Sequence, residues 1–522
     1  MKKTITSLVL LVCFIALMAT SATKEEIEAS IDAGIAWLVA QQNADGSWGY
    51  YSYYQVASTG LAVIKLEDRA FELGFDSPFD PGYPYSANVI AGLDFLFSNA
   101  HTISIIPQPA GNPDTNGNNI GVYIARGYYT YETGIALMAI AGSRDPSMIV
   151  TTGPLSGWTY GQVIQDMVDY LAFGQTDAPA PDRGGWGYIH NQTPYSDNSN
   201  SGYAVLGLDF AESPTFGFNA TVPAFVKSEL NFWINNIQDP VNGDTNDGGS
   251  WYRTNWSWVN ILKTGNLIYQ MAFYGDTQSA QRVIEAVDYI ERHWNDNNTD
   301  PGFRGYPGGI PHYQSMYCLM KGLERMGIET INVGGSDIDW FDEISTIIVD
   351  SQNADGSWPR DRYDYGYPYV LTAGWALLTL ERVVPAIIVP IDIKPGSCPN
   401  PLNLGSKGVL PVAVLGTEDF DVTDIDPTTI QLTREGVQGG VPPLRWSYED
   451  VATPFEGELC DCHDLDGDGY IDLTLKFDTQ ELVNDLELVT EAGNTIPLIL
   501  IGKLKEEAGG RDITGSDCIR VR

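Results

Sequence analysis

An acidic stretch near the C-terminal end has the residue types and spacing of a calcium-binding loop. Oxygen ligands would come from positions 1, 3, 5, 7 and 9 of the segment DLDGDGYID: Asp464, Asp466, Asp468, the backbone carbonyl of Tyr470, and Asp472. Hard oxygen ligands on alternate residues of a tight turn suit Ca²⁺. Leu475 stands where an EF-hand has its last glutamate, so a further ligand must come from elsewhere or from water. We expect structural calcium here, the alternative being a solvated acidic turn.

Four of the six cysteines lie in the same part of the chain: Cys398, Cys460, Cys462 and Cys518. The segment Cys-Asp-Cys-His that starts at Cys460 imitates a zinc-binding pattern. Clustered cysteines in an exported chain usually form disulfides, so we expect two such bonds, with the pairing left open. Cys318 stands apart, without an acid two residues away, and is interpreted as a buried apolar residue.

Aromatic and amide side chains gather just before each of six apolar helical stretches. They are Tyr53, Tyr54, Tyr128, Tyr129, Tyr131, Tyr195, Asn198, Trp256, Trp258, Asn260, His312, Tyr313, Tyr365, Tyr367 and Tyr369. Flat aromatic faces beside amides suit a sugar or an apolar ligand. We expect a ligand pocket formed mainly by Tyr54, Tyr131, Trp256, Trp258, Tyr313 and Tyr367. The alternative interpretation is that these rings only pack the helix ends.

Two acids of the same segments are candidate proton carriers. Glu132 and Asp197 could act as general acid and base, which would make a polysaccharide hydrolase or lyase conceivable. Asp364 is set aside because it lies in a loop beside Arg362. The alternative interpretation is that both acids are hydrogen-bonded structural groups.

Six copies of one helical unit must position these residues. Each copy ends a first helix with an aliphatic or aromatic pair: Trp37-Leu38, Phe95-Leu96, Tyr170-Leu171, Trp233-Ile234, Tyr289-Ile290 and Ile347-Ile348. In the first and last copies the pair is followed, at the same spacing, by Gln, Gly and Trp. These are Gln42, Gly46 and Trp48 in the first copy and Gln352, Gly356 and Trp358 in the last, and both copies contain the pentapeptide NADGS. A fixed spacing of this kind indicates a repeat architecture.

A second helix follows each copy, opened by a small-residue step such as Thr133-Gly134. These second helices are apolar on most sides and are expected to form an inner ring, while the first helices keep a polar outer face. Glycine inside a helix costs about 1 kcal/mol relative to alanine, so its recurrence indicates close approach of neighbouring inner helices. The six pairs fill residues 23–385 and predict an all-α (α/α)6 toroid.

The Gln-x-x-x-Gly-x-Trp pattern resembles the QW repeat of squalene and hopene cyclases. The wider unit is similar to the terpene-cyclase and protein-prenyltransferase toroids, over residues 23–385. The resemblance implies that the glutamine hydrogen-bonds to the next unit and that the tryptophan ring stacks over it. We therefore interpret Gln42, Trp48, Gln352 and Trp358 as structural.

The catalytic signatures of these families are missing from the sequence. No Asp-x-Asp-Asp motif occurs, and Asp337-Ile338-Asp339 is interpreted as the solvated first turn of a helix. The zinc ligands of prenyltransferases and the Cys-Gly-Glu-Gln thioester of complement-like toroids are also missing. The first hypothesis is therefore a non-catalytic scaffold that binds a small molecule, a glycan or a cell-surface protein. Its rival is an extracellular enzyme at the toroid rim, either a polysaccharide hydrolase or lyase or a cyclase-like enzyme, that uses Glu132 and Asp197.

The N-terminal residues and the charge indicate an exported protein. Two lysines, an apolar run and then small residues predict a signal peptide over residues 1–22, too short for a useful membrane span. The 67 acidic residues outnumber the 29 basic ones, giving a formal net charge of −38 that disfavours nucleic acid and anionic lipid. We expect a secreted or cell-surface protein without a membrane span in its mature form.

From residue 391 the pattern changes to short β-branched runs separated by turn residues. Expected strands are Ile391 to Ile393, Gly408 to Leu415, Thr429 to Leu432, Leu473 to Phe477, and Ile496 to Ile501. This spacing predicts a β-sandwich over residues 391–522, after a linker at 386–390. The opening segments resemble a domain appended to exported archaeal and bacterial proteins.

Overall fold

The computed structural model describes residues 21–191, 195–254, 256–296, 302–305, 309–381, 387–417, 420–434, 437, 439–455, 457, 459–460, 465–505, 508 and 512–522. The chain divides into two compact units, Met1–Arg382 and Val383–Arg522. Residues 1–20 of the expected signal peptide and residue 386 of the expected linker lie outside the described residues.

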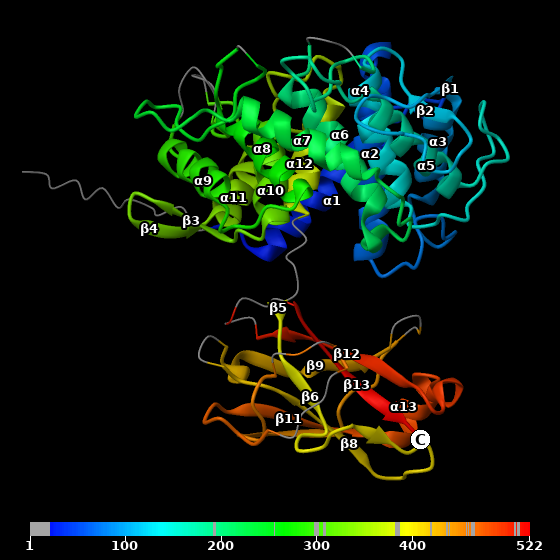
Figure 1. Ribbon diagram of the computed structural model, residues 1–522, viewed down its shortest axis with the longest axis vertical. Coiled ribbons are helices and arrows are strands. Elements are labelled where there is room, and N and C mark those ends of the chain that lie inside the picture. Colours follow the sequence, from blue (N-terminus) through cyan, green and yellow to red (C-terminus); the bar gives the residue numbers. More distant parts are fainter. Residues whose placement is uncertain are drawn as a thin grey trace, which may run out of the picture. The chain divides into compact units, whose positions relative to one another are not determined.

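The first unit contains both helices of each predicted pair (Figure 1). The first helices of the pairs are α1 (Lys24–Ala40), α3 (Ser86–Ser98), α5 (Tyr160–Gly174), α7 (Ala224–Ile237), α9 (Gln281–His293) and α11 (Trp340–Ser351). The second helices are α2 (Ser52–Glu72), α4 (Tyr129–Gly142), α6 (Asn198–Glu212), α8 (Ile261–Tyr274), α10 (Tyr313–Met326) and α12 (Val370–Leu380). The second helices are the inner set: in α4, for example, every residue from Thr130 to Gly142 except Tyr131 is buried.

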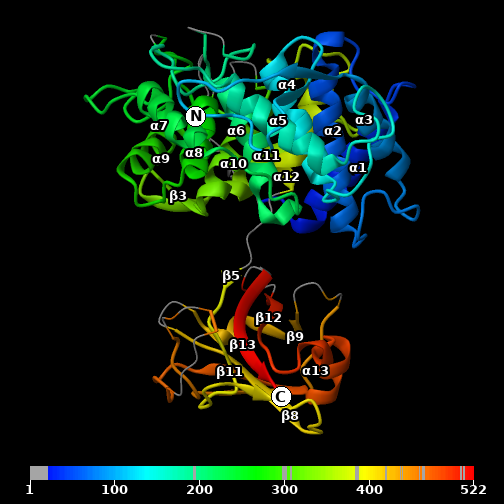
Figure 2. The ribbon, with the colours of Figure 1, turned by 45° about the vertical axis from the view of Figure 1, so that its right-hand side comes forward.

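The inner helices contact one another in chain order and then close on themselves. Each of α2, α4, α6, α8, α10 and α12 packs against the next, and α12 packs against α2. In both ribbon views α12 (yellow) and α2 (blue) lie side by side (Figures 1 and 2). The helical unit is therefore a closed, toroid-like ring with one helix of each pair inside it.

The repeated glutamines, present in four of the six repeats, tie their own unit to the next. The side-chain amide of Gln42 donates to the carbonyl of Asn88 at the start of α3 (3.0 Å) and that of Gln352 donates to the carbonyl of Ser30 in α1 (2.9 Å). The same bond joins Gln175 to Val226 in α7 and Gln238 to Arg282 in α9. The structural role expected for Gln42 and Gln352 is thus visible, and the bond from Gln352 closes the ring.

The repeated tryptophans lock each pair internally. The indole N–H of Trp48 donates to Leu38 and that of Trp358 to Ile348, in both cases a carbonyl near the end of the preceding outer helix. Both rings are buried, and a Cβ at Gly34 of α1 would lie 2.6 Å from the Trp358 ring. The tryptophans therefore also pack against the outer helix of the next pair.

The small-residue step in the inner helices has two structural reasons. Its hydroxyl accepts a backbone N–H from the preceding turn, as in Thr59 with Trp48 (2.9 Å). Its glycine lets neighbouring inner helices approach: a Cβ at Gly134 would lie 2.3 Å from the carbonyl oxygen of Tyr203, and one at Gly265 would lie 2.7 Å from Leu319 Cα. A side chain at either position would force the two helices apart.

The sequence predicts an all-α unit, but the helical unit also contains β-strands. Two antiparallel hairpins interrupt it, β1 (Ala100–Ser104) with β2 (Ile120–Ile124), and β3 (Thr330–Val333) with β4 (Ser336–Asp339). Asp339 caps the start of α11, whereas Asp337 lies in β4 rather than in the expected first helical turn. Among the helices of the described chain, none is long and apolar enough to cross a membrane.

The second unit consists of two small sheets that share one hydrophobic core. One sheet has the order β10 (Arg445–Glu449), β11 (Asp472–Asp478), β8 (Val409–Val414) and β6 (Ile391–Ile393). The other has the order β5 (Ile387–Ile388), β13 (Asp512–Val521), β12 (Thr495–Leu504) and β9 (Ile425–Thr433), with β7 (Pro401–Leu402) paired to β13. The five expected strand segments are present, and a short helix, α13 (Thr479–Asp485), follows β11.

Candidate functional site

A cavity of about 460 Å³ lies where the inner helices begin, a volume in the range of ordinary small-ligand sites. Its lining is mostly aromatic: Tyr54, Tyr128, Tyr131, Tyr188, Tyr252, Tyr363, Tyr365, Trp256 and Trp258, joined by Ser199, Asn260, Leu262, Lys263 and Gln314. Among the described lining residues there is no carboxylate.

The ring architecture places these residues together although they are far apart in sequence. Tyr54, Tyr131, Ser199, Lys263 and Gln314 occupy the second or third position of inner helices α2, α4, α6, α8 and α10. Leu262 is the second residue of α8, and the others lie in the turns that lead into the inner helices, including α12. Because all the inner helices begin at the same end of the ring, equivalent positions of successive repeats face one space.

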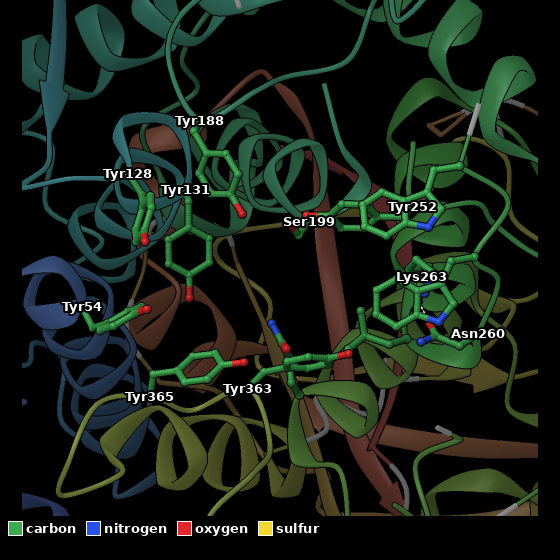
Figure 3. Close-up of a pocket in the computed structure, with 14 residues that line it drawn as sticks. Tyr54, Tyr128, Tyr131, Tyr188, Ser199, Tyr252, Asn260, Lys263, Tyr363 and Tyr365 are labelled. Atoms are coloured by element: carbon green, nitrogen blue, oxygen red, sulfur yellow. Dashed lines mark hydrogen bonds between the residues drawn. The ribbon is translucent and has the colours of Figure 1, made fainter. Parts of the chain in front are cut away.

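The tyrosines surround this space as a near-continuous aromatic wall (Figure 3). Tyr54, Tyr128 and Tyr365 lie on one side, and Tyr252, Asn260 and Lys263 lie on the other. Ring centroids are 6.0 Å apart for Tyr54 and Tyr128, and 6.4 Å apart for Tyr54 and Tyr365. Burial, reinforced by Tyr128, raises the pKa of Tyr54 to about 12. Its hydroxyl is therefore a neutral hydrogen-bonding group at physiological pH.

Lys263 is the charged residue among the described lining residues. Its side chain is buried, and Nζ lies 3.5 Å from the centroid of the Trp258 ring. A buried ammonium on an aromatic face is stabilised by the ring quadrupole. The cavity thus combines a positive group with aromatic surfaces and a few neutral polar groups.

Glu132, one of the two predicted proton carriers, is buried beneath the cavity lining rather than within it. Its Oε2 accepts three backbone N–H groups, from Arg126, Gly127 and Tyr128, at 2.8 to 2.9 Å. Burial raises the pKa of Glu132 despite those three bonds, which lower it. The carboxylate fixes the turn before α4, and through it the position of Tyr128.

Asp197 has the same kind of role at α6. It is the N-cap of this helix, with Oδ1 accepting from the Asn200 backbone (2.9 Å) and the Ser199 hydroxyl (2.6 Å). Burial raises its pKa above the ordinary value. Like Glu132 it is absent from the cavity lining, so the structural interpretation of both acids fits their contacts better than the catalytic one.

Two further acids lie buried in the turn before α12. Asp361 faces His312, with 2.9 Å between Oδ2 and Nδ1. Burial raises the pKa of Asp361, but the neighbouring imidazole and hydrogen bonds lower it by more, so this pKa lies below its ordinary value. Asp364 accepts from the backbone and hydroxyl of Thr372, and burial raises its pKa to about 6. Both carboxylates organise the turn that carries Tyr363 and Tyr365.

Four of the six expected pocket residues line the cavity, namely Tyr54, Tyr131, Trp256 and Trp258, and two do not. Tyr313 is fully buried and its hydroxyl donates to Ser351, because the first residue of α10 points into the helix packing rather than into the opening. Tyr367 is 62% exposed and packs edge-on against Tyr369.

The sequence reasoning missed several lining residues, among them Tyr188, Tyr252, Lys263 and Gln314. A signal was present for the first two, because each follows the repeat tryptophan closely, at Trp186 and Trp251. Lys263 and Gln314 carried no comparable signal. They share a position near the start of an inner helix, and only the closed ring shows that this position faces the cavity.

Four of the five expected calcium ligands lie in the part of the second unit that the structure describes. Asp464 lies outside the described residues, and Asp466 and Asp468 are exposed. Asp472 is instead a buried structural group, since its two oxygens accept backbone N–H groups from Gly416, Val451 and Ala452. An acid that the sequence reasoning did not consider, Asp450, accepts from the backbone of Asp468 and Gly469.

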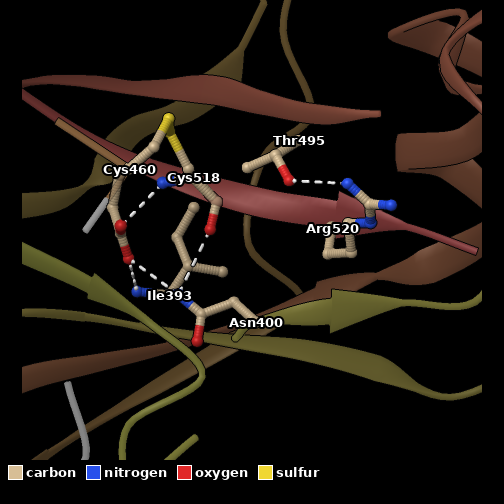
Figure 4. The surroundings of a disulfide bond; sticks show 7 residues. Ile393, Asn400, Cys460, Thr495, Cys518 and Arg520 are labelled. Atoms are coloured by element: carbon tan, nitrogen blue, oxygen red, sulfur yellow. Dashed lines mark hydrogen bonds between the residues drawn. A yellow bond between two sulfur atoms is a disulfide. The ribbon is translucent and has the colours of Figure 1, made fainter. Parts of the chain in front are cut away.

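One disulfide is defined in this unit, between Cys460 and Cys518 of β13 (Figure 4). Asn400 donates to the carbonyl of Cys518, which anchors the segment before β7 to the same strand (Figure 4). Cys398 is also disulfide-bonded, and Cys462 lies outside the described residues. Cys318 in the helical unit is a free, buried thiol whose pKa is raised by burial, in keeping with its interpretation as an apolar residue.

No protein-family model and no curated protein matches the chain. Among solved structures, it is similar to the type II terpene cyclase MstE from Scytonema, with 14% identity, a TM-score of 0.37, and coverage of 69% of this chain and 98% of the cyclase. A glycoside hydrolase family 76 mannosidase from Bacteroides thetaiotaomicron shows 8% identity, a TM-score of 0.40, and coverage of 69% and 98%. A Candida albicans protein geranylgeranyltransferase-I shows 10% identity, a TM-score of 0.38, and coverage of 67% and 90%. At these identities and TM-scores, neither a family nor a reaction follows.

Proposed function

We propose that the helical unit is an (α/α)6 toroid of an exported protein and binds a carbohydrate in its aromatic cavity. The observation that carries the proposal is the lining, in which flat tyrosine and tryptophan faces are joined by hydroxyl, amide and amine groups. Sugar rings have an apolar face and a polar edge, and both find partners in such a wall. An isoprenoid would leave the buried Lys263 and Asn260 facing hydrocarbon, which is unfavourable.

The proposal treats the protein as a binding scaffold. A rim enzyme using Glu132 and Asp197 remains the alternative, but it requires both carboxylates to reach the ligand. Each is engaged by backbone or neighbouring side chains below the lining. Detectable hydrolysis or elimination of a glycan that disappears in Glu132→Gln or Asp197→Asn would favour the enzyme.

Carbohydrate binding can be tested with a glycan array followed by titration calorimetry. Trp256→Ala should weaken binding of any glycan that is found by about 10-fold or more, equivalent to about 1.4 kcal/mol. Trp446→Ala is a matched control, because this tryptophan is 43% exposed against 46% for Trp256 and lies in the other unit. Equal effects of the two substitutions would contradict the proposed site.

We also propose that the second unit is a β-sandwich and that its acidic loop binds calcium. Asp466, Asp468 and the carbonyl of Tyr470 would supply oxygen ligands, with Asp450 close by. The chain's high negative charge is consistent with an extracellular, cation-rich medium. Together with export, this gives a secreted or cell-surface binding protein whose second unit is stabilised by calcium and disulfide bonds.

A further inference from the structure

The charge balance at the mouth of the cavity is opposite to that of the whole chain. We define the mouth as the last part of the turn before each inner helix, excluding the earlier part that follows the outer helix, together with the first turn of the inner helix. It comprises the described residues within 49–55, 125–132, 188–201, 251–264, 302–316 and 359–370. These segments carry six lysines and arginines: Arg126, Arg253, Lys263, Arg304, Arg360 and Arg362. Their four acids are Glu132, Asp197, Asp361 and Asp364. In the complete sequence, by contrast, 67 acids face 29 bases.

The acids and bases of the mouth also differ in where they lie. All four acids are buried, with exposed fractions of 0 to 3%, and are held by hydrogen bonds inside the turns. Arg126, Arg360 and Arg362 are exposed, and Arg253 is half-buried. Within the mouth as defined, the exposed or half-buried charged groups are therefore guanidinium groups, beside aromatic rings, and the described residues there include no exposed carboxylate.

Two of these guanidinium groups are stacked on rings that line the cavity. Arg253 Cζ lies 5.1 Å from the centroid of Trp256, and Arg360 Cζ lies 5.7 Å from the centroid of Tyr365. Stacking holds the planar groups beside the opening while leaving N–H donors at their edges. Lys263 places a third positive charge within the cavity.

The backbone adds to the same potential. The six inner helices all begin at the mouth, and the N-terminal end of a helix carries a partial positive charge. The sum is a local positive field on a strongly acidic protein.

We propose that the ligand of this cavity is an acidic oligosaccharide, with one carboxylate near Lys263 and others along the mouth at Arg253 and Arg360. This inference rests on the proposed carbohydrate binding and specifies the class of sugar. Uronic acid rings offer both of the required features, an apolar face for the tyrosines and a carboxylate for the cations. Nucleic acid would also bring rings and charge, but its denser phosphates are more strongly opposed by the net charge of −38.

The test uses two probes that differ in charge and little else: oligogalacturonate and its fully methyl-esterified form. Oligogalacturonate should bind the full chain at least 10-fold more tightly, and its Kd should rise with NaCl concentration. Arg253→Gln and Arg360→Gln should each weaken oligogalacturonate binding by about 5-fold and leave the ester unaffected. Lys263→Met should weaken it further, by about 10-fold or more.

Arg144→Gln is the matched control, because this exposed arginine also stacks on an aromatic ring, Phe71 at 3.9 Å, but lies beyond the opposite end of α4. It should leave both affinities unchanged. Equal affinity for acid and ester would overturn the acidic-sugar inference while supporting carbohydrate binding. Preference for single-stranded DNA over oligogalacturonate would overturn the inference and the proposed function together. Failure of the folded chain to bind any glycan on an array would do the same.

Discussion

The repeat glutamines offer a direct test of how the ring is held closed. Gln42 makes three side-chain hydrogen bonds: to the carbonyl of Gly46 (3.0 Å), to the carbonyl of Asn88 (3.0 Å), and from the Asn88 amide (2.6 Å). Its neighbour Gln41 makes one weaker bond within its own helix, to Trp37 (3.4 Å). Both side chains are half-buried. Substituting these two adjacent glutamines one at a time therefore distinguishes the loss of bonds between repeats from the loss of a local bond.

Gln42→Ala should lower the free energy of unfolding of the helical unit by about 2–3 kcal/mol, at about 1 kcal/mol for each bond lost. Gln41→Ala should lower it by about 0.5 kcal/mol, since its bond is long and local. Guanidinium denaturation of the full chain, followed by circular dichroism at 222 nm, would report mainly on the helices of the first unit. A double-mutant cycle with Asn88→Ala should give a coupling energy of about 1 kcal/mol. Equal losses for Gln41→Ala and Gln42→Ala would refute the idea that glutamines join the repeats.

The remaining predictions concern packing, protonation and calcium. Trp358→Ala should lower stability by about 3–5 kcal/mol in the same denaturation assay, as for large buried aromatics, and a loss below about 1 kcal/mol would contradict its packing against Gly34. Gly265→Ala should destabilise by about 1–3 kcal/mol, because its Cβ would meet Leu319 of the next inner helix, while Gly405→Ala should have little effect. Burial, together with the charges of Asp517 and Asp472, raises the pKa of Asp392 to about 7 in the folded protein. Because the folded state then binds the proton more tightly than the unfolded state, protonated Asp392 stabilises the fold. This stabilisation is lost as the pH rises from about 4 to 7. Asp392→Asn should then raise the melting temperature of the second unit at pH 8 but not at pH 4. Removing calcium with EGTA should lower the melting of the second unit in calorimetry, and Asp466→Ala, unlike Asp485→Ala, should abolish the response.

The helical fold was predictable because each repeat carries its own signals. The tryptophan and glutamine positions, and the glycine that follows Ser or Thr, are set by contacts within a repeat and with the neighbouring repeat, so they recur at fixed spacing. Hairpin β1–β2 lies in an insertion within the second repeat, between α3 and α4, and hairpin β3–β4 lies between α10 and α11 of successive repeats. Neither hairpin is set by such a contact. Strand β10 was missed because every one of its residues, Arg445 to Glu449, is exposed and mostly polar.

The candidate site was predictable at the level of location but less so at the level of residues. Aromatic richness before the inner helices indicated the correct end of the ring. Tyr313 and Tyr367 were placed wrongly in the pocket because sequence position does not specify whether a ring points inward at a helix start. The sequence could not predict the burial of Glu132 and Asp197 either, because only the folded turns bring backbone N–H groups to each carboxylate.

The closure of the ring has a consequence for how this chain could be rearranged. Helix α1 packs against α11 and α12, and Gln352 bonds to Ser30, so the first and last helices of the unit are neighbours. A short linker could join them directly, and new termini could then be opened in an exposed turn between two other repeats. Such a circular permutant would retain every contact between repeats. A ring of this kind has no structurally necessary beginning, and the present start of the chain is one of several that the same packing would accept.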